Sequence, residues 1–242
     1  MGGFTYLFRG LKMILGDRRL LKLAAMPLLV NIAVFALFFL SFNFFAFHIS
    51  SYVFTQSSQE WYWALLSMVT GAALFVISIL AVIFTFTAVG LIIASPFNDA
   101  LSRAVEEKLT GGAIERKMPI WALAKLVMAN ESRKMALLLA IQALLFLMNL
   151  VPGIGNMAFV AASGFFVAFA MAYEFAGYTL DRRGYTFAEK RMFILSRPWT
   201  CLGFGLAVAG ALLIPFINLA FMPVAVAGGS ILAVENDPAL RG

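Results

Sequence analysis

The sequence predicts an all-α integral membrane protein, and three observations lead to this fold class. First, 62% of the 242 residues are hydrophobic and 12% are charged, whereas soluble domains average about 45 to 50% and about 25%. Second, the charged residues leave four gaps of 37 to 39 residues, at 23–59, 61–98, 135–173 and 198–234. A membrane-spanning helix needs about 20 apolar residues. Third, proline interrupts the middle of the last two gaps only, which separates long helices from helical hairpins.

The first two gaps predict two long transmembrane helices, over 17–58 and 61–110. Pro27 and Pro96 lie near the ends of these gaps, so the middle of each helix has no proline. A polar turn at 55–60 joins the helices as an antiparallel pair. We expect the second helix to continue beyond Pro96, because Asp99, Arg103 and Glu107 follow at i, i+4 spacing, and to stop at Gly111 and Gly112.

The last two gaps predict helical hairpins over 133–177 and 198–234. Their tips carry residues that favour turns, namely Pro152, Gly153 and Asn156 in the first and Pro215 and Asn218 in the second. The arms before the two tips have about 17 residues each, the lower limit for a full crossing. Arm length therefore leaves open whether each hairpin crosses the membrane or penetrates only part of it. A shallow tip needs protein around it, which favours a homo-oligomer.

Three further segments are predicted to be amphipathic and to lie on the membrane surface, at 1–16, 119–130 and 186–197. The first places apolar residues at helical spacing with Arg9 and Lys12 off that stripe. The third begins with a capping box in which Thr186 precedes Glu189 by three residues. All these elements form one membrane domain over 1–242.

The basic residues predict the topology. All 18 Lys and Arg residues lie before or at the start of the first long helix, at or after the end of the second, between the hairpins or at the chain end, and none lies near Glu60. The positive-inside rule then places both termini of a multi-pass membrane protein in the cytoplasm. Because these charges flank membrane segments, no nucleic-acid partner is expected; membrane lipid is the surrounding partner.

Motifs for catalysis and for cofactors are absent from the sequence. It contains neither of the nucleotide-binding motifs GxxxxGK[ST] and GxGxxG. It also lacks the HExxH motif of metalloproteases and the GxSxG motif of serine hydrolases. His48 has no carboxylate at helical spacing, and Cys201 is the only cysteine. We therefore predict no enzyme activity, no catalytic residue, no cofactor and no metal site.

A line of small residues runs along the second long helix. Ser67, Gly71, Ser78 and Thr85 are spaced by four, seven and seven residues, which places them on one face. Such a stripe either packs closely against another helix or lines a pore, and close packing is the favoured interpretation.

The turn before the first long helix is the candidate anion site. Gly16, Arg18 and Arg19 place a glycine, two guanidiniums and the free amides of a helix N-terminus together. These groups suit a tetrahedral oxyanion. In the alternative interpretation, Arg18 and Arg19 only anchor the helix at the membrane surface. Asp17 opposes a bound dianion unless it pairs with Arg18, Arg19 or Lys22.

Two stretches carry a family resemblance. Residues 95–99 (SPFND) with 104–108 (AVEEK), and the C-terminal segments 202–206, 214–219 and 222–228, resemble the CysZ-type sulfate permeases and the related etoposide-induced protein family. The resemblance implies a protein of the bacterial inner membrane with two long transmembrane helices and two partly penetrating hairpins, assembled as an oligomer. It also implies that sulfate binds at a Gly-x-Arg turn, here Gly16, Arg18 and Arg19. In the family pattern the residue after the glycine is apolar, whereas this chain has Asp17.

Together with the resemblance, these points favour a sulfate or oxyanion permease or channel that has no ATPase of its own. The resemblance implies that it supplies sulfate for cysteine synthesis. The alternative is a membrane-shaping or scaffold protein without transport activity, whose hairpins and surface helices wedge one leaflet.

Overall fold

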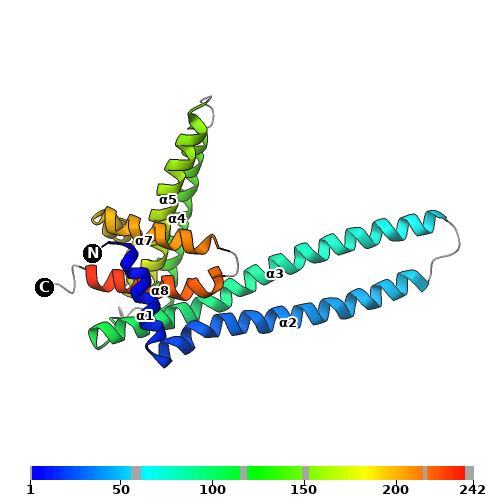
Figure 1. Cartoon of the computed structure of the whole chain (residues 1–242), viewed down its shortest axis with the longest axis horizontal. Coiled ribbons are helices and arrows are strands. Elements are labelled where there is room, and N and C mark those ends of the chain that lie inside the picture. Colours follow the sequence, from blue (N-terminus) through cyan, green and yellow to red (C-terminus); the bar gives the residue numbers. More distant parts are fainter. Residues whose placement is uncertain (1, 56–60, 115–118, 149–152, 215–216, 238–242) are drawn as a thin grey trace. The chain divides into compact units, whose positions relative to one another are not determined.

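The computed structural model describes residues 2–55, 61–114, 119–148, 153–214 and 217–237. Within these residues the chain is built from helices, as the sequence predicts, and no strand occurs in them (Figure 1). The helices are α1 (Phe4–Leu15), α2 (Arg18–Thr55), α3 (Trp61–Thr110), α4 (Ile120–Leu147), α5 (Gly155–Arg182), α6 (Phe187–Leu195), α7 (Pro198–Leu212) and α8 (Ile217–Asn236). The chain forms two compact units, one of residues 1–24 and 98–242 and one of residues 25–97.

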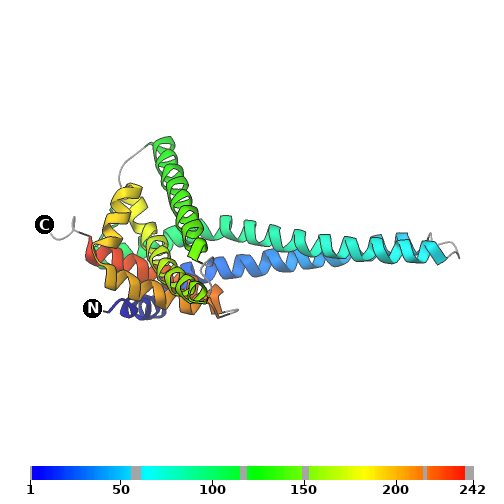
Figure 2. The same ribbon diagram turned by 90° about the horizontal axis from the view of Figure 1, so that it is seen from above.

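The unit of residues 25–97 contains most of the two predicted long helices. Here α2 and α3 run alongside each other in opposite directions (Figures 1 and 2). Large apolar side chains such as Phe35, Leu37 and Phe75 are exposed. In a membrane, surfaces of this kind face lipid or another protein. The segment Arg18–Ser41 of α2 is long and apolar enough to cross a membrane.

The unit of residues 1–24 and 98–242 holds the buried core. In it, α1 packs against α7 and α8, and α5 packs against α7 and α8. The end of α3 contributes Leu101 and Val105, which are fully buried with Phe204 and Ile231. This core fixes the position of the α1–α2 turn next to the end of α3.

Glycines allow the core helices to approach closely. A Cβ atom at Gly10 would lie 2.6 Å from the backbone nitrogen of Gly228 and 2.7 Å from the carbonyl oxygen of Val224. A Cβ atom at Gly205 would overlap the carbonyl group of Ala168. A larger residue at any of these crossings would push the helices apart, as in other small-residue contacts between membrane helices.

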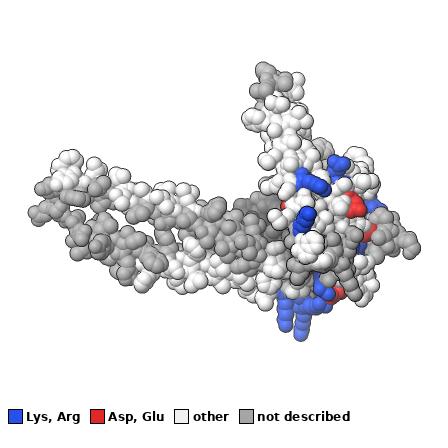
Figure 3. Space-filling model, turned by 180° about the vertical axis from the view of Figure 1, so that it is seen from behind, with Lys and Arg blue, Asp and Glu red and all other residues white. Residues whose placement is uncertain are grey.

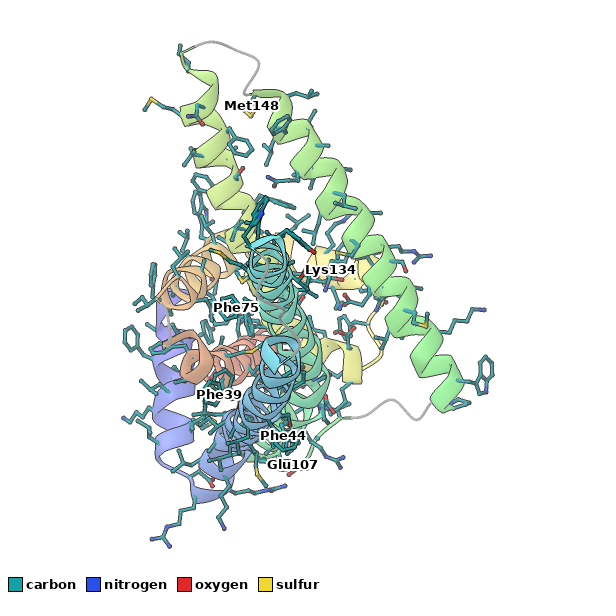
Figure 4. The ribbon with its side chains drawn as sticks, turned by 90° about the vertical axis from the view of Figure 1, so that its right-hand side faces the viewer. Phe39, Phe44, Phe75, Glu107, Lys134 and Met148 are labelled. Carbon is teal, nitrogen blue, oxygen red and sulfur yellow. The ribbon has the colours of Figure 1, made fainter. Side chains whose placement is uncertain are left out.

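Helices α4 and α5 form the first hairpin, with Met148 near its end (Figure 4). The structure joins the predicted surface segment 119–130 and the first hairpin arm into the single helix α4, because no glycine or proline interrupts residues 120–147. At the tip, Gly153 has a φ of +84°, a left-handed conformation that favours glycine. Helix α5 is a second segment long and apolar enough to span a membrane.

Helices α6 and α7 are joined by a sharp corner of 98°. The predicted capping box is present at the start of α6, where Thr186 and Glu189 each accept a hydrogen bond from the backbone of the other. Pro198 occupies the first turn of α7, a position that tolerates proline. Helix α8 follows α7 in the chain, and residues 215–216 between them lie outside the described part of the chain.

Candidate anion-binding site

The turn between α1 and α2 consists of Gly16 and Asp17. Gly16 ends α1 with a φ of −83°, and its amide donates a hydrogen bond to the carbonyl oxygen of Lys12 at 3.0 Å. This is right-handed helical backbone, so the turn does not depend on a glycine-only conformation. Helix α2 then begins at Arg18.

Asp17 caps the N-terminus of α2. Its carboxylate accepts hydrogen bonds from the backbone amides of Arg19 at 2.8 Å and Leu20 at 3.4 Å. The sequence predicts that the free amides at this helix N-terminus bind an external anion. In the structure, the Asp17 carboxylate accepts two of their hydrogen bonds instead. The other carboxylate oxygen accepts a hydrogen bond from the Lys108 ammonium at 2.6 Å. Lys108, and then the Arg19 amide, hold the pKa of Asp17 below its ordinary value.

Next to this turn lies an open cavity of about 690 Å³, whose walls come from the first turns of α2 and the end of α3. Both predicted arginines line it, whereas Gly16 does not. The lining residues are Arg18, Arg19, Lys22, Leu23, Ala100, Arg103 and Glu107. Figure 3 shows basic and acidic side chains close together on one face of the unit of residues 1–24 and 98–242.

Glu107 is the carboxylate among the residues that line the cavity. It forms ion pairs with Arg19 and with Arg103, each at 3.1 Å. Arg103, followed by Arg19, holds the pKa of Glu107 below its ordinary value. By contrast, the side chains of Arg18 and Lys22 form no hydrogen bond or ion pair with any described residue. Four cations and one carboxylate give the lining a formal charge of +3 (4 − 1).

This cavity includes three residues that the sequence did not assign to the anion site, namely Lys22, Arg103 and Glu107. Lys22 follows Arg18 by four residues, so both lie on one face of α2. The i, i+4 pair of Arg103 and Glu107 was visible in the sequence as a helix signal. Its ion pair with Arg19 depends on how the end of α3 packs against the α1–α2 turn, which the sequence does not show.

The other sequence candidates lie elsewhere. Of the predicted stripe on α3, Gly71 is exposed, and the side chains of Ser67, Ser78 and Thr85 lie outside the described ones. At the hairpin tips, Gly153 and Asn156 are exposed. Pro152, Pro215 and the side chain of Asn218 are likewise outside the described part of the chain.

A buried ion-pair network near the end of α5 was also missed by sequence reasoning. Glu106 is fully buried and pairs with Arg182 at 2.5 Å and Arg183 at 2.6 Å. Arg183 also pairs with the fully buried Asp237, just after α8. The network ties α3, α5 and the end of α8 together. Since each of its buried charges is already paired, it serves as a structural anchor rather than as an open anion site.

A second cavity, of about 580 Å³, lies between α4, α5 and α6 and is lined mainly by apolar side chains. Lys134 of α4, labelled in Figure 4, is one of the lining residues and pairs with Glu131 at 2.5 Å and Glu174 at 2.8 Å. Two carboxylates surround this ammonium, so the cavity is a poorer place for an anion than the one beside Arg18. Among the described residues, no group of three or more His, Cys, Asp or Glu side chains is arranged to hold a metal ion.

Comparison with known proteins gives one family. Residues 6–223 match the family model described as Sulfate transporter CysZ/Etoposide-induced protein 2.4. A protein named Sulfate transporter CysZ from Pseudomonas paraeruginosa is 34% identical over 245 residues, covering 98% of this chain and 96% of the relative. A protein of the same name from Vibrio cholerae serotype O1 is 31% identical, covering 96% of this chain and 92% of the relative.

Proposed function

This chain belongs to the sulfate transporter CysZ/etoposide-induced protein 2.4 family, and from that premise we propose that it transports sulfate across a bacterial membrane. The observation that carries the proposal is the cavity beside the α1–α2 turn, with a formal lining charge of +3. Sulfate is a small dianion, and a cavity of this charge attracts it and concentrates it at the protein surface.

The proposed binding site comprises Gly16, Arg18 and Arg19, with the two arginines as direct ligands. Guanidinium groups present forked donors that match pairs of oxyanion oxygens. Arg18 is the stronger candidate of the two, because its side chain has no partner among the described residues. Gly16 ends α1 and so sets the start of α2, from which both arginines extend.

The transport mode is proposed from the sequence. We expect a permease or channel without an ATPase in the same chain and without enzyme activity, since no nucleotide-binding motif is present. The expected location is the inner membrane, in a multi-pass arrangement with both termini in the cytoplasm. Sulfate admitted there would serve cysteine synthesis.

A homo-oligomer is part of the proposal. Leu139, Leu144 and Phe146 of the first hairpin are exposed. If the hairpin penetrates only part of the membrane, as the family resemblance implies, its tip needs protein around it. Replacing Gly153 by leucine, at a φ of +84°, should distort the tip and reduce assembly. Size-exclusion chromatography of the purified variant beside the parent protein measures this.

The alternative function, membrane shaping without transport, has support in α1. Phe4 and Phe8 are exposed on this short helix while Leu7 and Ile14 are buried, so α1 has an apolar face free to enter one leaflet. The two functions differ in one result. A scaffold protein would leave sulfate flux into liposomes unchanged, whereas a permease would raise it.

The binding step is tested by titration calorimetry of the detergent-solubilised protein with sulfate. The parent protein should release or absorb heat on binding, and Arg18→Gln should bind sulfate more weakly. Lys125→Gln, which removes an exposed charge from α4 away from the cavity, is the matched control and should bind as the parent does.

A further inference from the structure

The carboxylate of Glu107 occupies donors that a bound oxyanion would use. One of its oxygens pairs with a guanidinium nitrogen of Arg19 and the other with Nε of Arg103, both at 3.1 Å. Two oxygens of one tetrahedral anion, each held by a different arginine, would adopt a similar arrangement. Glu107 lines the same cavity as these arginines.

The remaining donors of the cavity are not engaged in this way. Arg18 and Lys22 lie one turn apart on α2, and neither side chain has a partner among the described residues. The cavity thus presents two cations that are held by Glu107 and two that are open to an incoming ion. A bound dianion would find Arg18 and Lys22 open but would have to compete with Glu107 for Arg19 and Arg103.

We propose that Glu107 is an internal competitor for the transported oxyanion, a regulatory element of the same site; this inference rests on the proposed function. Its negative charge repels the dianion and holds two of the four cations, so it weakens binding. Weak binding suits transport, because an ion held by four uncompensated cations would leave slowly. Glu107 thereby sets how quickly the site fills and empties.

Asp17, the other carboxylate nearby, does not play this part. Its oxygens are taken by the backbone amides of α2 and by Lys108, and it does not line the cavity. Lys108 is likewise absent from the lining. Competition for the cavity donors therefore falls to Glu107.

The test compares sulfate affinity in three full-length variants by titration calorimetry. Glu107→Gln keeps the size of the side chain and removes its charge, and should bind sulfate about threefold more tightly than the parent, given the strength of exposed ion pairs. Glu107→Ala should shift the affinity in the same direction, which covers a failure of the first variant to fold. Asp99→Asn is the matched control, because Asp99 lies on the same stretch of α3, pairs with Arg182 at 3.2 Å, and does not line the cavity.

Tighter binding in both Glu107 variants, with the affinity of Asp99→Asn unchanged, supports the proposal. Equal gains in Asp99→Asn and Glu107→Gln would mean that net charge alone sets affinity, and would overturn it. If the parent binds sulfate and Arg18→Gln binds it more weakly, but the Glu107 variants bind no better, the proposed function stands and the competitor role of Glu107 is refuted. Absence of sulfate binding in the parent and in every variant would overturn both.

Discussion

The Asp17 carboxylate and the Lys108 ammonium lie 2.6 Å apart, joining the α1–α2 turn to the last turn of α3. The two residues are 91 positions apart in the chain. The same carboxylate caps α2 through the Arg19 amide. This one side chain therefore orients the start of α2, and with it Arg18 and Arg19, toward the cavity.

The folded protein should become less stable in acid when Asp17 takes up a proton. Lys108 lowers the pKa of this carboxyl in the folded protein below its ordinary value of 3.8. Its stabilising contribution is then complete above that value and is lost as pH falls through the lower folded pKa. Melting temperatures of the parent between pH 6 and pH 3 should decline more steeply than those of Asp17→Asn, which keeps a capping side chain without a charge. Parallel curves for the two proteins would contradict this role.

Loss of the Arg18 guanidinium should weaken sulfate binding. A hydrogen bond to a charged group contributes about 1.5 to 3 kcal/mol, so Arg18→Ala should raise the dissociation constant about tenfold or more. Arg19→Ala should have a smaller net effect, because Glu107 already holds this guanidinium when sulfate is absent. Calorimetry at low ionic strength measures both. If both variants bind sulfate as strongly as the parent, Arg18 and Arg19 are not ligands and only anchor the helix at the membrane surface.

Glu106 should matter for stability rather than for binding. Its fully buried carboxylate holds Arg182 and Arg183, and removing one partner of a buried ion pair costs about 3 to 5 kcal/mol. Glu106→Gln should lower the melting temperature well below that of the parent. Asp99→Asn breaks the more exposed pair with Arg182, so it should change the melting temperature little. A Glu106→Gln protein that melts with the parent would show that the network does not anchor the fold.

The helices could be predicted from the sequence, and the environment of the anion site could not. Long uncharged gaps, Gly111 after α3 and the Thr186–Glu189 capping box are local signals, and each corresponds to an observed helix or helix end. The pairing of Asp17 with Lys108 and of Arg19 with Glu107 depends on how distant segments pack. No spacing rule reports such contacts, and the sequence suggested only Arg18, Arg19 or Lys22 as partners for Asp17.

The predicted topology has its own test. Cysteines at Ser57 and Gly184 in a Cys201→Ser background should react with a membrane-impermeant reagent from opposite sides, the first from the periplasm and the second from the cytoplasm. Cys201 is buried, so its replacement removes a background signal and adds no new site. Labelling of each position from both sides equally would mean that the basic clusters do not fix a single orientation.

Sulfate uptake into liposomes that contain only this protein tests the central claim most directly. With radiolabelled sulfate outside, uptake should rise with the amount of protein and should fall severalfold for Arg18→Ala reconstituted at the same density. Empty liposomes and the Lys125→Gln variant provide the two baselines. Uptake by the parent no faster than in empty liposomes, with the protein inserted and folded, would contradict sulfate transport by this chain.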